Sequence, residues 1–175
     1  MNKRTILGLL TGLAIAAQPA LAADDAVARG KYLVAVGGCT DCHTAGSLMG
    51  QPDMAHFLGG SNVGFSIPGL GVFVGPNLTS DKETGLGGWT DEQVVTAITT
   101  GVRPDGRKLA PSMPYMNLAA LTHDDALAIV AYLKSLPPVK NKVPGPFGAS
   151  EKVSVFVMDV LPPPVHNSLP PPPAH

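Results

Sequence analysis

The sequence predicts a small all-α domain, in which short helices are joined by long loops. Three segments combine apolar residues at helical spacing with residues that begin and end helices: 26–36, 91–100 and 122–136. Glycine and proline supply 38 of the 175 residues, which favours many turns between these helices. Only 5% of the residues are aromatic, so aromatic side chains alone can hardly fill the core, and something else is expected to fill part of it.

The composition excludes several classes of protein. Charged residues make up 14% of the chain, and its net charge is −1. Without a basic excess or a run of lysine and arginine, neither nucleic acid nor an anionic membrane surface is an expected partner. The chain has two cysteines, placed three positions apart, which excludes the disulfide scaffold of small secreted proteins.

Residues 1–22 are predicted to be a signal peptide. Lys3 and Arg4 precede an apolar run over residues 6–17, and Ala20-Leu21-Ala22 has the small-x-small pattern of a cleavage site. The apolar run is shorter than the roughly 20 residues needed to span a bilayer, and no later segment is long enough. A retained N-terminal anchor is the alternative. We therefore expect cleavage near Ala22 and export to the periplasm, with no transmembrane segment afterwards.

The rest of the chain is expected to form one domain over residues 23–138 and a proline-rich C-terminal extension over residues 139–175. The first helix of the domain is predicted over 26–36, with Asp24 or Asp25 as its N-cap and Gly37-Gly38 at its end. Gly30 lies inside this helix, where glycine costs about 1 kcal/mol relative to alanine. It is either a tolerated defect or a sign that another helix crosses closely there.

A long glycine-rich insertion follows over residues 44–75. Within it, residues 63–67 and 71–74 can pair as a short β-hairpin across Pro68-Gly69. This hairpin would be an exception in an otherwise helical domain.

The second helix is predicted over residues 91–100, with Thr90 as its N-cap and Gly101 at its end. Residues 103–117 contain three prolines, which predicts a loop.

Thr122 begins the clearest helix, which runs to Leu136 and ends at Pro137-Pro138. Eleven of the eighteen prolines lie from Pro137 onward. Residues 152–160 are an isolated apolar stretch, expected to be a strand or an extended arm. Residues 161–175 are expected to be polyproline-like or disordered.

Both cysteines belong to the pattern Cys-x-x-Cys-His, at Cys39, Cys42 and His43. This pattern is the attachment signature of c-type haem. Thiols at positions i and i+3 lie on one side of a helical turn, where each can bond to one haem vinyl group, and the histidine that follows can bind the iron. We therefore expect one haem c, covalently attached through Cys39 and Cys42, with His43 as a metal ligand.

Three other interpretations of the motif agree less well with the sequence. A thioredoxin-like redox pair would follow a strand in a βαβ unit, whereas this motif follows a helix. A zinc site would need four ligands, and the other histidines are scattered along the chain. A disulfide between residues three positions apart would close a very short loop and add little stability.

A second axial ligand is expected for the haem iron, and a methionine opposite a histidine raises the reduction potential. Met113 is favoured because it lies beside Pro114 in a loop between two helices. Met116 is its main rival, and any single methionine is more often a core residue than a ligand. His56 or His123 would instead give a bis-histidine haem of lower potential. An open sixth position would indicate ligand binding or peroxide chemistry.

Beyond the motif, the chain resembles class I cytochromes c over most of the predicted domain. The shared features, in order, are the first helix, the Cys-x-x-Cys-His motif, Gly75-Pro76-Asn77-Leu78, Trp89 before a helix, a loop methionine, and a last helix ending Ala-Tyr-Leu-Lys at 131–134.

The resemblance implies a set of haem-binding residues around the motif. The Pro76 carbonyl would accept a hydrogen bond from Nδ1–H of His43. Asn77 would belong to the same turn at the haem edge, and Leu78 would pack on the haem ring. Trp89 would donate to a haem propionate, with a plain core role as the alternative. The resemblance also implies that Gly30 meets Tyr132 where the first and last helices cross.

Three longer motifs are similar to the cytochrome subunits of bacterial periplasmic or membrane-bound dehydrogenases. They are Pro-Asn-Leu-Thr at 76–79, Glu-Thr-Gly-Leu-Gly-Gly-Trp-Thr at 83–90, and Ser-Met-Pro-Tyr at 112–115. In those subunits the methionine of the last motif is the distal ligand, which implies the same role for Met113. They often carry two or three haems, whereas this chain has a single attachment motif.

The expected function is one-electron transfer in the periplasm, without catalysis of bond formation or cleavage. The expected partners are redox proteins: a dehydrogenase that supplies electrons, and the respiratory chain or a terminal oxidase that receives them. Two alternatives belong to other classes. One is a haem protein with an open or labile distal site that senses a ligand or reduces peroxide. The other is a non-haem binding module with a disulfide between Cys39 and Cys42.

Overall fold

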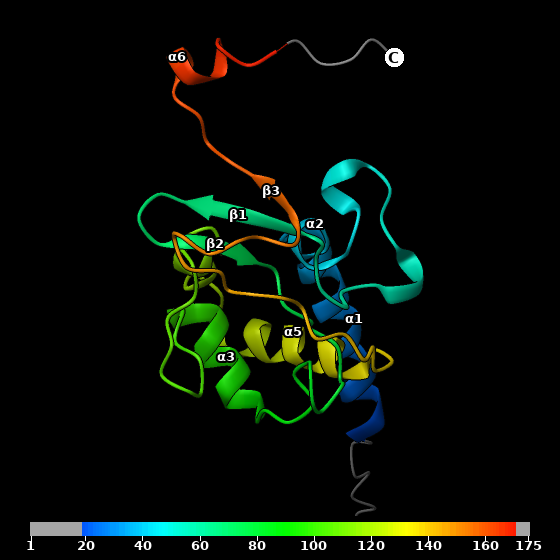
Figure 1. Cartoon of the computed structure of the whole chain (residues 1–175). Helices are drawn as coiled ribbons and strands as arrows, with labels where there is room; N and C mark the ends of the chain where they lie inside the picture. The colour runs from blue at the N-terminus through cyan, green and yellow to red at the C-terminus, as the bar shows by residue number, and fades with distance from the viewer. Residues whose placement is uncertain (1–18, 171–175) are drawn as a thin grey trace, which may run out of the picture.

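The computed structural model describes residues 19–170, so residues 1–18 of the predicted signal peptide and residues 171–175 lie outside the described part. The helices are α1 (Pro19–Val36), α2 (Cys39–His43), α3 (Asp91–Thr100), α4 (Tyr115–Leu118), α5 (His123–Ser135) and α6 (Pro163–His166). The strands are β1 (Val63–Ile67), β2 (Gly71–Val74) and β3 (Phe156–Met158), and two 3₁₀ turns, η1 (Ser47–Met49) and η2 (Met54–His56), precede them. The all-α expectation is therefore only partly right, because a small sheet lies beside the helices (Figure 1).

The start of the first helix differs from the prediction. Helix α1 ends at Val36 as expected, but it begins at Pro19 rather than at residue 26. Asp24 and Asp25 therefore lie inside the helix and are not its N-cap. The physical reason is local propensity, since proline is favoured at the first helical position and the alanine-rich segment after it contains no helix breaker.

Helices α1 and α5 cross closely at Gly30. A Cβ atom on Gly30 would overlap the carbonyl of Ala128 and lie 2.8 Å from the Cβ of Tyr132. This confirms the close helix crossing that the mid-helix glycine suggested and that the family resemblance placed between Gly30 and Tyr132. Arg29, next along α1, pairs with Asp125 at the start of α5 over 2.8 Å.

The predicted ends of α3 and α5 are confirmed. The Thr90 hydroxyl accepts a hydrogen bond from the Gln93 backbone, and the Gln93 side chain accepts one from the Thr90 backbone, which forms a capping box. Gly101 ends α3 in the left-handed conformation, with φ +73°. The Thr122 side chain caps α5 by accepting a hydrogen bond from the backbone N–H of Asp125. The predicted loop over 103–117 is wrong in one place, because the turn α4 follows Pro114, whose fixed φ suits a helix start.

The core lies between α1, α3 and α5. Its buried side chains come from these helices, from the loop before β1 and from the loop before α3; they are Val34, Leu58, Leu86, Val94, Val95, Ala126, Ile129, Val130 and Leu133. Within residues 19–170, no helix has the length and apolar character that crossing a bilayer requires.

The hairpin predicted within the insertion is confirmed, with β1 and β2 antiparallel and Ile67 opposite Gly71. The C-terminal extension adds a third strand, because β3 pairs in parallel with β1 and sets Phe156 opposite Val63. Phe147 of the extension bridges to the outer side of β2. The middle of the apolar stretch 152–160 is thus a strand, which lies at the edge of the sheet.

The rest of the extension also differs from a free polyproline tail. After α5 the chain runs back along the sheet before it reaches β3 (Figure 1). Residues 163–166 then form the helical turn α6, which stands apart from the packed domain (Figure 1). Two prolines in its first turn remove backbone N–H groups that a helix start would leave unpaired in any case.

Candidate functional site

Helix α2 places the two cysteines and the histidine on one short turn. Gly38 leads into it with φ +65°, and the Thr44 backbone closes it by donating to the Thr40 carbonyl. Cys39 and Cys42 are free and half-buried. Burial raises the pKa of the Cys39 thiol and, in the same way, the pKa of the Cys42 thiol. Both side chains are therefore protonated thiols at neutral pH.

His43 is held by a hydrogen bond from its ring to the turn after β2. The residue is 5% exposed, and its Nδ1–H donates to the Pro76 carbonyl over 2.7 Å. Burial lowers the pKa of His43, and the bond to Pro76 offsets this only in part. The imidazole is therefore neutral at pH 7, with its proton on Nδ1. Its Nε2 makes no hydrogen bond with residues 19–170, so its lone pair can bind a metal ion.

Gly75 lets the turn approach α2. A Cβ atom on Gly75 would overlap the carbonyl of Cys42 and lie 3.4 Å from Nδ1 of His43. Any other residue would push the Pro76 carbonyl away from the histidine. Gly75 is not among the site residues predicted from the sequence, although its position directly before Pro76 is a signal for such a role.

Asn77, expected at the haem edge, has every polar atom of its side chain engaged by protein. Its Nδ2 donates to the Thr84 hydroxyl over 3.0 Å and to the Val139 carbonyl over 2.6 Å. Its Oδ1 accepts from the backbone and the hydroxyl of Thr79. An amide offers two donors and two acceptor sites, so no hydrogen-bonding group of Asn77 is left for a cofactor. The side chain organises the turn instead.

Leu78 and Trp89 both lie half-buried against the core. The Leu78 backbone donates to the Leu58 carbonyl over 2.9 Å, which ties the turn to the middle of the glycine-rich insertion. The Arg103 guanidinium lies over the Trp89 ring, 5.0 Å from its centroid, and Lys134 Nζ donates to the Trp89 carbonyl. The indole N–H makes no hydrogen bond within residues 19–170.

The two candidate methionines differ in exposure. Met113 is half-buried in the loop before α4, where its backbone bonds to Ala110 and Tyr115. Met116 is 76% exposed on α4. The structure brings α2 and the 75–78 turn together, whereas no hydrogen bond in the described part of the chain links the Met113 loop to α2.

The donor set around α2 fits covalent haem attachment. Two adjacent thiols can form thioethers, and a neutral imidazole with its Nδ1 proton engaged presents Nε2 to iron. By contrast, no three His, Cys, Asp or Glu side chains gather as a metal site anywhere in residues 19–170. The described residues therefore do not form the four-ligand zinc site considered from the sequence.

Comparisons with known proteins agree with this chemistry. Residues 27–137 match the model of the cytochrome c family. The alcohol dehydrogenase (quinone) cytochrome c subunit of Gluconobacter oxydans is 36% identical over 77% of this chain. The fructose dehydrogenase cytochrome subunit of Gluconobacter japonicus is 33% identical over 87%, and the gluconate 2-dehydrogenase cytochrome c subunit of Pantoea cypripedii 37% over 74%.

The chain spans less than a third of the length of these relatives, with 27% of the first, 32% of the second and 28% of the third covered. The family match nevertheless includes α2, the 75–78 turn, α3, α5 and the part of α1 from residue 27 onward. This chain therefore belongs to the cytochrome c family, whose domain carries a covalently bound c-type haem.

Proposed function

We propose that this chain is a periplasmic one-electron carrier with a single c-type haem, attached through Cys39 and Cys42 and bound axially by His43 and Met113. The observation that carries the proposal is the state of His43, which is neutral and has Nδ1 bonded to Pro76 on the same turn as two free thiols. One attachment motif in the chain supports one haem.

Once the haem is attached, the residues of the site hold it in place and take no part in making or breaking bonds. When bound, the haem supplies an iron that gains and loses one electron. The Pro76 carbonyl keeps the proton of His43 on Nδ1, which fixes the ring orientation and strengthens Nε2 as a donor. Burial keeps the imidazole neutral, so iron does not compete with a proton for Nε2 at neutral pH. A fixed ligand limits the rearrangement that accompanies electron transfer.

Met113 is the better candidate for the second ligand. Its half-buried position in a loop with a proline on its C-terminal side suits a sulfur held in place, whereas Met116 extends into solvent. Leu78 and Trp89 are proposed to contact the haem, with the free indole N–H available to a propionate. Asn77 is proposed to act on the turn alone.

The names of the relatives support a dehydrogenase as electron donor. Three of them are cytochrome subunits of alcohol, fructose and gluconate dehydrogenases. We propose that this chain accepts electrons from a periplasmic dehydrogenase and passes them to the respiratory chain. The signal-peptide pattern over residues 1–22 supports export.

Absorption spectra and the mass of the matured protein test this proposal. The chain is produced in a host that attaches haem and exports protein. We expect a mass increase of one haem and a low-spin spectrum with the weak red ferric band of methionine–iron bonding. That band should disappear in Met113→Ala and persist in the matched control Met116→Ala.

Two outcomes would contradict the proposal. An unmodified mass would remove the haem and leave a module with two free or disulfide-bonded cysteines. A high-spin spectrum that responds immediately to carbon monoxide would indicate an open distal site, and with it a sensor or a peroxidase instead of a carrier.

A further inference from the structure

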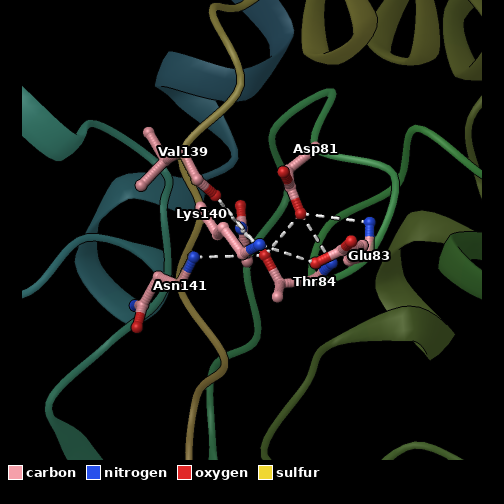
Figure 2. Close-up of polar contacts among 7 residues, drawn as sticks. Asp81, Glu83, Thr84, Val139, Lys140 and Asn141 are labelled. Atoms are coloured by element: carbon pink, nitrogen blue, oxygen red, sulfur yellow. Dashed lines mark hydrogen bonds and ion pairs between the residues drawn. The ribbon is translucent and has the colours of Figure 1, made fainter.

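The segment that follows α5 is bonded to the loop that carries the haem-edge turn. We call residues Val139, Lys140 and Asn141 the clasp. Figure 2 shows the clasp beside Asp81, Glu83 and Thr84, with hydrogen bonds between the two stretches. These residues are about 55 to 60 positions apart in sequence, so only the tertiary fold brings them together.

The clasp reaches His43 by a first route through Asn77. The Val139 carbonyl accepts a hydrogen bond from Asn77 Nδ2, and the Val139 N–H donates to the Thr79 hydroxyl over 3.1 Å. The Asn77 nitrogen and the Pro76 carbonyl belong to one planar peptide unit. Fixing Asn77 therefore restrains the direction of the oxygen that accepts from His43.

Thr84 is the centre of this route. Its Oγ1 accepts from Asn77 Nδ2 over 3.0 Å and from the Asn141 N–H over 3.1 Å, and it donates to Asp81 over 2.7 Å (Figure 2). A hydroxyl has one proton and two acceptor sites, and all three are used here. Loss of this single oxygen would leave one N–H of the buried Asn77 amide and the backbone N–H of Asn141 without an acceptor.

A second route reaches the backbone of His43. Asn141 Nδ2 donates to the Gly59 carbonyl over 2.9 Å, and the next N–H, that of Gly60, donates to the His43 carbonyl over 2.8 Å. The Val143 side chain covers the same point, since a Cβ atom on Gly60 would overlap its Cγ2. The C-terminal segment thus supports both the ring and the backbone of His43.

We propose that the clasp positions the His43 imidazole, with Thr84 and Asn141 as positioning residues that act through Asn77 and Gly60. This inference rests on the proposed function, in which His43 binds iron. It assigns a role to residues that directly follow α5, which the sequence places in the C-terminal extension.

The expected consequence is electronic as well as structural. A carbonyl that accepts from Nδ1–H makes the imidazole a stronger donor to iron and favours the ferric state. When the clasp is loosened, the Pro76 carbonyl points less well at Nδ1 and this hydrogen bond weakens. The ferrous state then becomes more stable relative to the ferric state. Loss of such supporting partners commonly costs about tenfold or more in metal affinity or activity.

The test uses the haem-loaded full-length protein and four variants. Thr84→Val removes the hydroxyl and keeps the shape, while Thr84→Ser restores it. Asn141→Ala removes the link to Gly59. Lys140→Ala is the matched control, because Lys140 lies in the clasp but, among residues 19–170, its side chain forms an ion pair with the exposed Glu83, over 2.9 Å, and no hydrogen bond to Asn77 or Gly59.

The measurements are the exchange rate of the His43 Nδ1 proton by NMR in the reduced state and the midpoint potential. In Thr84→Val and Asn141→Ala we expect the proton to exchange up to about tenfold faster, the factor that corresponds to weakening one typical hydrogen bond. We also expect the ratio of reduced to oxidised protein at a fixed ambient potential to rise about threefold. Thr84→Ser and Lys140→Ala should match the wild type in both.

The controls separate this inference from the proposed function. If the wild-type protein lacks haem or lacks His43 ligation, the proposed function is wrong. If the wild type is a normal low-spin haem protein and both quantities stay unchanged in Asn141→Ala and Thr84→Val, only the role of the clasp is wrong. If Thr84→Val fails to fold, Asn141→Ala alone decides, because Asn141 is exposed.

Discussion

The Nδ1–H of His43 donates to the carbonyl of Pro76 over 2.7 Å, although the two residues lie 33 positions apart. This contact connects α2 to the turn that follows the hairpin. It also fixes which ring nitrogen carries the proton, so that the other nitrogen can bind a metal. The glycine-rich insertion between the two residues is the path by which the chain leaves α2 and returns to it.

Gly75→Ala should damage this contact directly. The new Cβ atom would overlap the Cys42 carbonyl, so the turn must move away from His43. We expect a loss of about 1–3 kcal/mol in the free energy of unfolding, measured with denaturant, and a lower yield of haem-loaded protein. In Gly148→Ala the nearest atom, on the Glu151 side chain, would lie at 3.6 Å, an ordinary van der Waals contact, and stability should change little. Equal stability of both variants would contradict the close approach of Gly75 to the Cys42 carbonyl.

Gly30→Ala should destabilise the crossing of α1 and α5. Alanine gains about 1 kcal/mol in helix propensity, but its Cβ would overlap a backbone carbonyl of α5, and such overpacking costs about 1–3 kcal/mol. Because backbone atoms cannot turn aside as a side chain can, we expect the overlap to prevail and the melting temperature to fall. Lys31→Ala, at the exposed neighbouring position, is the control. A stabilised Gly30→Ala would show that the helices separate without cost.

Thr90→Ala should remove one half of the capping box of α3. The hydroxyl accepts from the Gln93 backbone over 3.2 Å, and loss of an N-cap residue costs about 1 kcal/mol. Chemical denaturation measures the change. Thr96→Ala removes an exposed threonine from the same helix, where the side chain makes no hydrogen bond in the described residues, and should be neutral or slightly stabilising.

Asp81 should contribute to stability in a pH-dependent way. The Thr84 hydroxyl and nearby backbone N–H groups hold the pKa of Asp81 below its ordinary value of 3.8. A carboxylate with a lowered pKa in the folded state stabilises the fold above about pH 4, and this stabilisation is lost as the pH falls through the folded-state pKa.

Asp81→Asn should therefore flatten the loss of stability below about pH 4, measured as melting temperature against pH. Asp159→Asn is the control, because the Asp159 carboxylate makes no hydrogen bond within residues 19–170. Parallel pH profiles for wild type and Asp81→Asn would show that Asp81 is not linked to folding.

Truncation should show where the structural domain ends. A chain that stops at residue 160 loses α6, which stands apart from the domain, and should keep its stability. A chain that stops at residue 138 leaves Asn77 without the Val139 carbonyl and Thr79 without the Val139 N–H. Each unpaired buried group costs about 1–3 kcal/mol, so this chain should unfold at clearly lower denaturant. Equal unfolding midpoints for the full chain and the chain ending at residue 138 would support the predicted domain boundary at residue 138.

Local features of the sequence predicted much of the secondary structure. Thr90 and Thr122 were recognised as helix caps, and Pro68-Gly69 as a hairpin turn, because each of these signals acts over a few residues. The donor set at Cys39, Cys42 and His43 was recognised for the same reason, since its spacing lies within one helical turn. Errors arose where a short segment had no distinctive signal, as at α4 and α6.

Long-range relationships could be foreseen only in part. Gly30 implied a close crossing, and the partner Tyr132 came from resemblance to a family rather than from spacing. Nothing in the residues beyond Leu136 indicated that they would return to the loop of Asn77 and Thr84, or that β3 would pair in parallel with β1.

The sequence by itself determined the reactive groups and the helices that carry them, because covalent spacing and helix capping are set by neighbours along the chain. Tertiary structure decided that Pro76 meets His43 and that Val139 and Asn141 support the turn between them. Those contacts form only when segments far apart in sequence are packed together, since a buried amide or carbonyl takes whichever partner the folded chain brings within hydrogen-bonding distance.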